Sequence, residues 1–264
     1  MRLISTGLIA VVATIAATGI TLSADLPVKP PAYAPPVAAP YNWTGSYIGG
    51  NIGYGWGSDP IDLTPFAVFP AGTVPISLAD NPRGVLGGVQ YGTNWQLNRV
   101  VLGWDSDFSF SDIKASQTVL TAPGGIATSA EQKLDWLSTT RGRLGYLITD
   151  NLLLYGTGGL ASGRASANTF ITQVGCPIGR CLGGSESKTS WGWAAGGGLE
   201  YAIGHWLVRA EYLHYDLGDL NFNVVDPRTV ALVAATNKVS GNIVRGALSY
   251  KFDWTFWDLL FGRR

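Results

Sequence analysis

The sequence predicts an all-β fold, an eight-stranded antiparallel up-and-down transmembrane β-barrel, and three observations carry this prediction. Long segments alternate large apolar residues with small or charged ones, which is the period of a strand with two unlike faces. Only 14% of the residues are charged, against roughly 25% in soluble proteins, whereas Gly, Trp and Tyr are abundant. The connections between the segments alternate between short and long, as they do in outer-membrane barrels.

Length and composition exclude several other classes. The formal net charge is zero, which argues against nucleic acid as a partner. The mean hydropathy is only +0.16, and no apolar run after residue 24 approaches the ~20 residues of a membrane-spanning helix. The 264 residues suffice for one barrel with extensions at both ends.

The N-terminal region predicts export followed by a linker. Residues 1–24 contain a long apolar segment that ends in Leu22-Ser23-Ala24, which is typical of a secretory signal peptide cleaved near Ala24. An uncleaved membrane anchor is the alternative, because the apolar segment is long enough. Residues 25–42 are rich in Pro and Ala and predict an extended periplasmic linker; binding to a proline-recognising partner is the alternative reading.

The segment 190–216 defines the strand pattern. Trp191 and Trp193 alternate with small residues, Gly204-His205 forms a two-residue turn, and the alternation then resumes with the opposite parity. By the same criterion, eight strands are predicted at 43–56, 85–96, 100–111, 133–146, 152–165, 190–203, 206–216 and 239–252. The fifth strand fits least well: with Leu153 and Tyr155 facing lipid, Leu160 falls on the inner face.

The charged residues sort onto one face once the large apolar residues are assigned to lipid. Asp216 alone lies on an apolar face, and a Lys or Arg facing the bilayer centre would cost about 2–4 kcal/mol. We therefore expect a lumen ion-pair network, with Glu200 directly opposite Arg209 and with Lys133 and Lys251 on the same inner face. Its predicted members are Asp105, Asp107, Asp135, Arg141, Arg143, Arg164, Glu200, Arg209, Glu211 and Arg245.

Tryptophans near the strand ends predict aromatic girdles at the two membrane surfaces. The predicted girdle residues are Trp56, Trp95, Trp104, Trp136, Trp191, Trp193 and Trp206.

The connections predict the topology. Tight turns are expected at 98–99, 150–151 and 204–205, and long loops at 58–82, 112–130, 171–187 and 219–237. Short turns are typical of the periplasmic side and long loops of the cell surface, so both termini are expected in the periplasm. The only two cysteines, Cys176 and Cys181, lie in the third long loop and predict a disulfide. Residues 253–264 form a C-terminal extension, either an aromatic segment on the membrane surface or a disordered tail.

Several motifs resemble one known family. They are Trp43-Thr-Gly-Ser-Tyr-Ile-Gly-Gly-Asn, Gly87-Gly-Val-Gln-Tyr-Gly, Arg141-Gly-Arg-Leu-Gly-Tyr, Leu154-Tyr-Gly-Thr-Gly-Gly and Ala210-Glu-Tyr-Leu-His-Tyr-Asp. In this order they resemble the small outer-membrane proteins of alphaproteobacteria, which include rhizobial and Brucella surface proteins and haemin-binding proteins of Bartonella. The resemblance implies an OmpA-like, porin-like barrel in the outer membrane of a Gram-negative bacterium. Members of that family end at the aromatic residue that corresponds to Phe252, which serves as the assembly signal, whereas this chain continues.

No catalytic constellation is evident. The only histidines are His205 and His214, and His214 lies near Asp216 without a serine beside them. We therefore expect no enzymatic activity, no cofactor and no metal. The predicted function is a structural surface protein with a side-chain-filled lumen, and the alternatives are a narrow channel for small solutes or loops that bind haem or a host surface. The expected partners are outer-membrane lipid and lipopolysaccharide and the barrel-assembly machinery.

Overall fold

The computed structural model describes residues 40–57, 61–65, 77–78, 81–121, 125–173, 175, 181–226, 228 and 232–254. The predicted signal peptide, most of the predicted linker and residues 255–264 of the C-terminal extension lie outside this part of the chain. None of the described residues belong to a helix long and apolar enough to cross a membrane.

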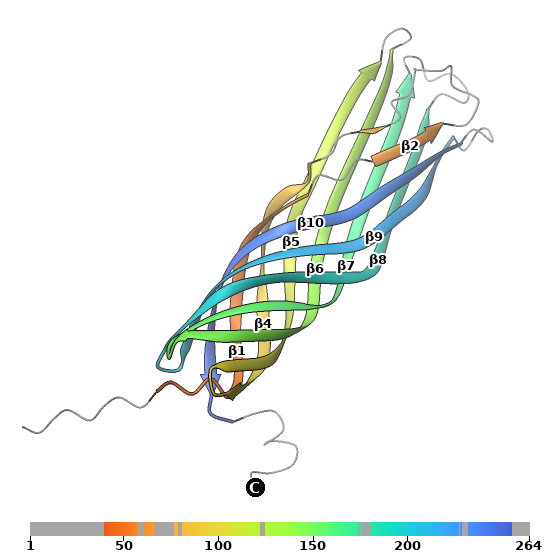
Figure 1. The fold of residues 1–264 in the computed structure, drawn as a ribbon. Helices are drawn as coiled ribbons and strands as arrows, with labels where there is room; N and C mark the ends of the chain where they lie inside the picture. Colours follow the sequence, from red (N-terminus) through yellow and green to blue (C-terminus); the bar gives the residue numbers. More distant parts are fainter. Residues whose placement is uncertain are drawn as a thin grey trace, which may run out of the picture. The chain divides into compact units, whose positions relative to one another are not determined.

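The described residues form ten β-strands, eight of which close into a ring (Figure 1). Every neighbouring pair in the ring is antiparallel, and the pairing of the first strand with the last closes it. The eight-stranded antiparallel barrel predicted from the sequence is thereby confirmed. The ring strands are β1 (Gly45–Trp56), β4 (Arg83–Leu97), β5 (Val100–Thr121), β6 (Ile126–Thr149), β7 (Leu152–Gln173), β8 (Leu182–Ile203), β9 (Trp206–Val225) and β10 (Leu232–Phe252).

The three predicted tight turns lie at one end of the barrel. Leu97 pairs with Val100 and Ile203 pairs with Trp206, so each of these turns contains two residues. Asn98 and Gly204 have φ angles of 56° and 58°, the left-handed conformation that such turns require. The third turn, at Asp150-Asn151, is preceded by a β-bulge between Leu147 and Thr149.

This bulge reverses the faces of β7 relative to the prediction. Leu153 and Tyr155 are buried in the lumen, whereas Leu154 and Leu160 are 49% and 63% exposed on the outer wall. The prediction for this strand was wrong because the extra residue at Ile148 shifts the parity, and a count from the turn does not reveal a bulge. Leu160, which did not fit the prediction, thus faces lipid with the other large apolar residues.

Three predicted long loops are strands over most of their length. β5 and β6 continue to Thr121 and Ile126, and the β7–β8 and β9–β10 pairs are extended in the same way. Beyond the membrane the pattern inverts: on β6, Ile126 and Ala130 are buried, while Ser129 is partly exposed and Glu131 exposed. The expectation of loops at 112–130, 171–187 and 219–237 was wrong because these strands carry only a few large apolar residues on the outer face, such as Leu120 and Val225, and so do not show the alternation of a membrane strand.

A short hairpin within the predicted loop at 58–82 adds to the extended part of the barrel. It consists of β2 (Ile61–Pro65) and β3 (Ser77–Leu78). β2 pairs with residues 233–237 of β10, and Leu63 and Leu78 are almost completely buried. These two leucines pack in an apolar cluster with Ile126, Ile171 and Val224. The hairpin therefore contributes to a core inside the extension.

Apolar side chains also fill the lumen closer to the turns. One cluster, near the tight turns, includes Trp43, Tyr47, Leu147, Leu153 and Leu207. A second cluster, farther along the barrel, contains Leu86, Ile113, Leu134, Leu137, Ala161, Ala165, Ala194, Leu213, Tyr215, Leu217, Leu220, Val239 and Ile243. The barrel interior is therefore packed, as an eight-stranded barrel allows.

One seam in the wall lacks ladder pairing. β8 and β9 pair from Ile203 and Trp206 as far as Trp193 and Asp216, and next at Gly183 and Val225. Between these points residues 184–192 and 217–224 form no ladder pairs with each other. Gly218, at a φ of 76°, lies at a bulge on β9 where its amide donates to Asp216 Oδ1.

Candidate functional site: a charged layer across the lumen

Eight charged side chains converge inside the barrel between the two inner apolar clusters. They come from five strands, and each residue is at most 4% exposed. The members are Asp105 and Asp107 on β5, Arg141 and Arg143 on β6, Glu200 on β8, Arg209 and Glu211 on β9, and Arg245 on β10. We call this set the lumen charge layer.

Strand register and glycines position these side chains. Asp105 is the direct partner of Arg141, Glu200 of Arg209, and Glu211 of Arg245. Glycines on the adjacent strands face several members: Gly92 pairs with Asp105, and Gly198 with Glu211. A Cβ at Gly198 would lie 2.9 Å from the Tyr155 hydroxyl, so the missing side chain makes room for the layer.

The half of the layer nearer the turns is built around Tyr47. Arg209 contacts Glu200 Oε2 through Nε at 2.6 Å and Asp105 Oδ2 through NH1 at 2.9 Å. Arg143 NH2 donates to Glu200 Oε2 at 3.1 Å. The Tyr47 hydroxyl donates to Asp105 and accepts from both arginines. Two cations and one anion therefore share one phenol, and Glu200 joins the same two cations.

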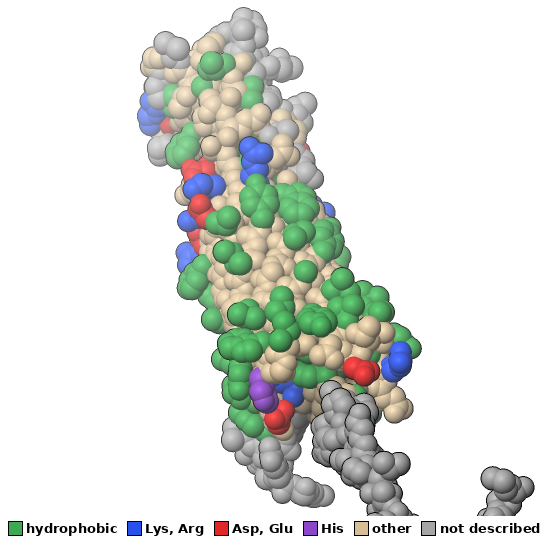
Figure 2. Space-filling view, turned by 90° about the vertical axis from the view of Figure 1, so that its left-hand side faces the viewer, with side chains coloured by type: hydrophobic (Ala, Val, Ile, Leu, Met, Phe, Trp, Pro, Cys, Tyr) green, Lys and Arg blue, Asp and Glu red, His purple; other side chains and the backbone are tan. Residues whose placement is uncertain are grey.

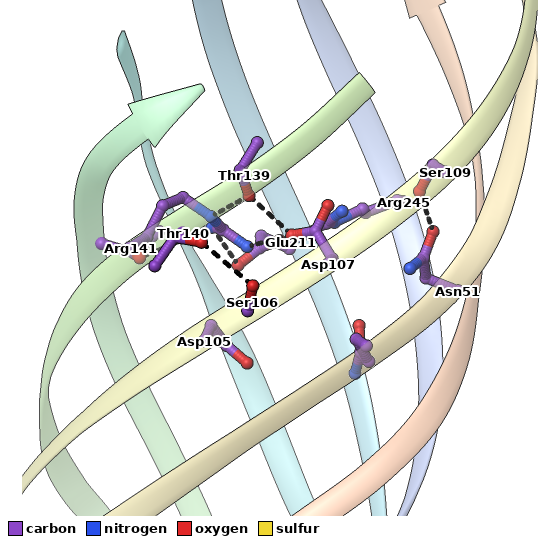
Figure 3. A network of polar contacts seen from close by, with 12 residues as sticks. Asn51, Asp105, Ser106, Asp107, Ser109, Thr139, Thr140, Arg141, Glu211 and Arg245 are labelled. Carbon is purple, nitrogen blue, oxygen red and sulfur yellow. Dashed lines mark hydrogen bonds and ion pairs between the residues drawn. The ribbon is translucent and has the colours of Figure 1, made fainter. Parts of the chain in front are cut away.

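The other half contains Asp107, Arg141, Glu211 and Arg245 (Figure 3). Arg141 contacts Asp107 at 2.9 Å and Glu211 at 3.1 Å. Arg245 NH2 contacts the same two carboxylates at 2.9 and 2.6 Å. Thr139 donates to Asp107 Oδ2 at 2.7 Å and accepts from Arg141 Nε. Each arginine thus bridges both acids.

Tyr155 joins the two halves and was missed by the sequence analysis. Its hydroxyl donates to Glu211 Oε1 at 2.8 Å, and the guanidinium of Arg143 lies 4.1 Å from its ring centroid. The sequence assigned Tyr155 to lipid because of the undetected bulge before β7. In the predicted strand Leu160 fell on the inner face, and this misfit of a large apolar residue was the one indication that the parity of the strand should be reversed.

The layer is electrically neutral, because four arginines face two aspartates and two glutamates. Each half is neutral as well, with two arginines and two acids. Among the described residues, three atoms of the layer have no hydrogen-bond partner: Asp107 Oδ1, Arg143 Nε and Glu200 Oε1. All three side chains are nevertheless ion-paired through their other atoms, which is what a charge in a low-dielectric lumen requires.

Two predicted members of the network lie outside the lumen. Asp135 is the extra residue of a bulge in the β6–β7 ladder, which turns Leu134 inward and Lys133 outward. Asp135 and Lys133 form a 3.0 Å ion pair on the outer surface. Arg164, on the reversed β7, is exposed and donates to Ser187 Oγ. The predictions for Asp135, Lys133 and Arg164 were therefore wrong, and both errors arise from bulges.

The ends of the barrel hold further predicted residues. Lys251 is buried near the turns, where it pairs with Asp253 at 2.9 Å. The predicted girdle residues Trp56, Trp191, Trp193 and Trp206 are 38–73% exposed, and Trp95, Trp104 and Trp136 are half-buried. Trp43 is completely buried instead, and its indole donates to Asp150 O at 3.0 Å, so this ring closes the lumen at the turn end. Cys181 is disulfide-bonded, and Cys176 lies outside the described residues.

The chain is similar to several outer-membrane proteins. Residues 31–252 match the family model described as outer membrane protein beta-barrel domain. The 31 kDa outer-membrane immunogenic protein of Brucella melitensis is 39% identical over 249 residues, which cover 92% of this chain and 98% of that protein. The 22 kDa outer membrane protein of Rhizobium leguminosarum is 29% identical over 190 residues, with 72% and 71% coverage. Among solved structures, OprG of Pseudomonas aeruginosa aligns over 80% of this chain and 97% of its own, with 15% identity and a TM-score of 0.49.

Proposed function

The chain belongs to the outer membrane protein β-barrel family and is a protein of the Gram-negative outer membrane, and from this premise we propose that it serves envelope integrity as a closed, non-enzymatic barrel. In this role the barrel is a stable wall element whose extended strands reach the cell surface. Its lumen excludes solutes rather than passing them.

The lumen charge layer is the observation that carries this proposal. It crosses the barrel between two apolar clusters, and its side chains are paired to one another across five strands. A solute or ion passing through would have to separate these pairs, and an unpaired buried charge costs about 3–5 kcal/mol. This cost supports a closed wall over the alternative of a narrow channel.

The surroundings of both histidines support a non-enzymatic role. His214 Nδ1 lies 3.0 Å from Asn242 Oδ1, and the same oxygen accepts a hydrogen bond from Tyr212. Asp216 binds the amide of Gly218 and lies 3.6 Å from Lys238. His205 is engaged with the carbonyl of Lys251 at the turn end. In these surroundings neither histidine is arranged as a general base beside a nucleophile.

The receptor alternative, in which external loops bind haem or a host surface, depends on the distal strand tips. The connections at 66–76 and 176–180 lie outside the described residues. No observation on the described part of the chain favours haem or a host ligand in the way that the charge layer favours a closed barrel.

Planar-bilayer recording tests the closed lumen directly. We expect the purified wild-type barrel to show no steady conductance. The matched positive control replaces the neutral set Asp107, Arg141, Glu211 and Arg245 with alanine, so that net charge is kept while the outer half of the layer is removed. Heat-modifiability on gels verifies that this variant folds. Large, steady wild-type conductance would contradict the proposal.

Complementation tests the role in the envelope. A strain without the protein is expected to become sensitive to bile salts and to recover with the wild type. It should also recover with a variant that lacks the extended part of β5 and β6. In this variant residues 116–131 are replaced by an Asn-Gly turn that joins Ala115 to its direct partner Gln132. Recovery with the wild type alone would contradict a barrel-based role and favour a receptor at the strand tips.

A further inference from the structure

A row of cations crosses the outer surface of four neighbouring strands. Arg83 on β4 is the direct partner of Lys114 on β5, which is the direct partner of Lys133 on β6. Lys133 pairs with Ser166 on β7, and Arg164 lies two residues from it on the same face. We call Arg83, Lys114, Lys133 and Arg164 the basic row.

The basic row carries excess positive charge. Asp112 pairs with Lys114 at 3.1 Å and Asp135 with Lys133 at 3.0 Å, and Glu131 lies one step farther out on β6. Among the described residues of this surface, three acids stand against four cations, which leaves an excess of positive charge. Like charges directly opposite each other on a sheet are destabilising, which makes an external anion a favourable addition.

The row lies at the outer edge of the lipid-facing wall. On its membrane side, Phe110 pairs with Trp136, and Trp136 pairs with Arg164. Phe110 is 70% exposed and Val85, two residues from Arg83, is 57% exposed. In Figure 2 hydrophobic side chains cover the wall, and charged side chains gather beyond them toward the extended strands. This is the depth at which lipid headgroups meet the aromatic girdle.

An apolar groove begins directly below the row. It has a volume of about 350 Å³ and is lined by Ile52, Val85, Leu86, Gly87, Phe110, Ser111 and Asp112. Its floor is open because Gly87 has no side chain, and a second groove of about 370 Å³ between Ile48 and Phe108 lies farther along the same strands. Grooves of this shape on a lipid-facing wall suit acyl chains.

We propose that the basic row and the adjoining groove form a binding site for a phosphorylated, acylated glycolipid of the outer leaflet, of the lipid A type. With strands about 4.8 Å apart, the row spans roughly 14 Å, which suits a headgroup with two phosphates better than a phospholipid with one. The cations bind the phosphates, and the groove holds an acyl chain beside Phe110. The proposal rests on the outer-membrane location and is independent of whether the barrel conducts.

Native mass spectrometry of the purified, detergent-solubilised protein with added bisphosphorylated lipid A tests the site. Each cation near a membrane surface contributes about 1 kcal/mol, which is about fivefold in affinity. We therefore expect Arg83→Gln/Lys114→Gln/Lys133→Gln to weaken retention of lipid A roughly 100-fold. Gly87→Val should weaken it as well, because a Cβ there meets its nearest atom, Asn51 O, at an ordinary 3.4 Å and fills the groove.

Matched controls separate this site from general effects. Lys238→Gln removes an outer-surface cation on β10, and Gly156→Val adds bulk on the outer face of β7, where the nearest atom is 3.9 Å away. Both should retain lipid A as the wild type does, and all variants are checked for heat-modifiability. The proposal would be overturned if the triple variant retained lipid A as well as the wild type does, or if the controls lost it equally. Equal binding of dephosphorylated lipid A or of phosphatidylglycerol would also overturn it.

Discussion

Glu200 and Arg209 illustrate, at the residue scale, how the lumen is held closed. They are direct partners across a two-residue turn, and each also contacts a member of the layer on another strand. Glu200 binds Arg143, and Arg209 binds Asp105. The pair is therefore part of a four-charge arrangement around Tyr47, and its energetics cannot be those of an isolated ion pair.

Charge reversal tests this coupling. Glu200→Arg and Arg209→Glu should each lower the free energy of unfolding by about 3–5 kcal/mol, because each leaves unpaired charge in the lumen. The double swap should recover only part of the loss, since Arg143 and Asp105 would then face like charges. Urea unfolding in lipid vesicles measures both. Unchanged stability of the single variants, or no recovery in the double variant, would show that the pairing is wrong.

Tyr155 provides a second residue-scale prediction. Tyr155→Phe keeps the ring beneath Arg143 and removes the hydrogen bond to Glu211, so we expect a loss of about 1–3 kcal/mol in the free energy of unfolding. Tyr146→Phe, on the lipid-facing wall of β6, is the matched control and should be close to neutral. Equal effects of the two changes would contradict a special role for Tyr155.

Comparison of the predicted and observed faces shows which residues the alternation of apolar and polar positions can assign to the lumen. Asp105, Arg141 and Glu211 could be assigned to the lumen because membrane lipid forbids charges on the other face. Asp135 and Arg164 could not, because each depends on a bulge, and a bulge changes parity without a distinct residue signature. Tyr155 was missed because of the bulge before β7, and Trp43 was missed because an aromatic residue is compatible with either face.

At the scale of strands, the eight ring elements could be predicted, but their outer limits could not. Inside the membrane the large apolar residues face outward, whereas in the extension they face inward, as Ile126 and Ile171 do. Strand propensity continues through this change, but the pattern typical of a membrane strand ends. Bulges at 111–112 on β5, at Asp135 on β6 and at Gly218 on β9 mark the transition.

Cysteine labelling tests the reversed face of β7. In a Cys176→Ser/Cys181→Ser background, Leu154→Cys and Leu160→Cys should react with a membrane-soluble maleimide in native membranes. Leu153→Cys and Ala161→Cys should stay unlabelled until the barrel unfolds, because those positions are at most 1% exposed. The opposite labelling pattern would restore the parity predicted from the sequence.

The arrangement of turns and strand tips predicts which segments are accessible on the cell surface. Figure 1 shows the tight turns at one end of the barrel and the extended strand pairs at the other. An epitope inserted at Gly175 should bind antibody on intact cells, whereas one at Asp150-Asn151 should bind only after permeabilisation. Surface labelling at 150–151 would contradict the orientation.

At the scale of the whole barrel, the described part of the C-terminal extension, Asp253 and Trp254, contacts the end of the barrel. The carbonyl of Trp254 accepts from the amide of Ser46 at 2.9 Å, and Asp253 pairs with Lys251. Truncation after Trp254 should therefore give wild-type heat-modifiability. Truncation after Phe252 should still give a folded barrel, with a melting temperature lowered by the loss of these two contacts. Failure of the longer form to insert would show that residues 255–264 are needed for assembly.

The pairing of β1 with β10 has a kinetic consequence. Ser46 meets Phe252, so the contact that closes the ring joins the two ends of the barrel sequence, whereas most other ladders join neighbouring hairpin strands. Contacts of such long sequence separation form slowly, and until this one forms the curved sheet has two free edges. During that interval closure competes with strand addition from a second chain. The ratio of these two rates, rather than the final stability, determines the yield of single-chain barrels at high protein concentration.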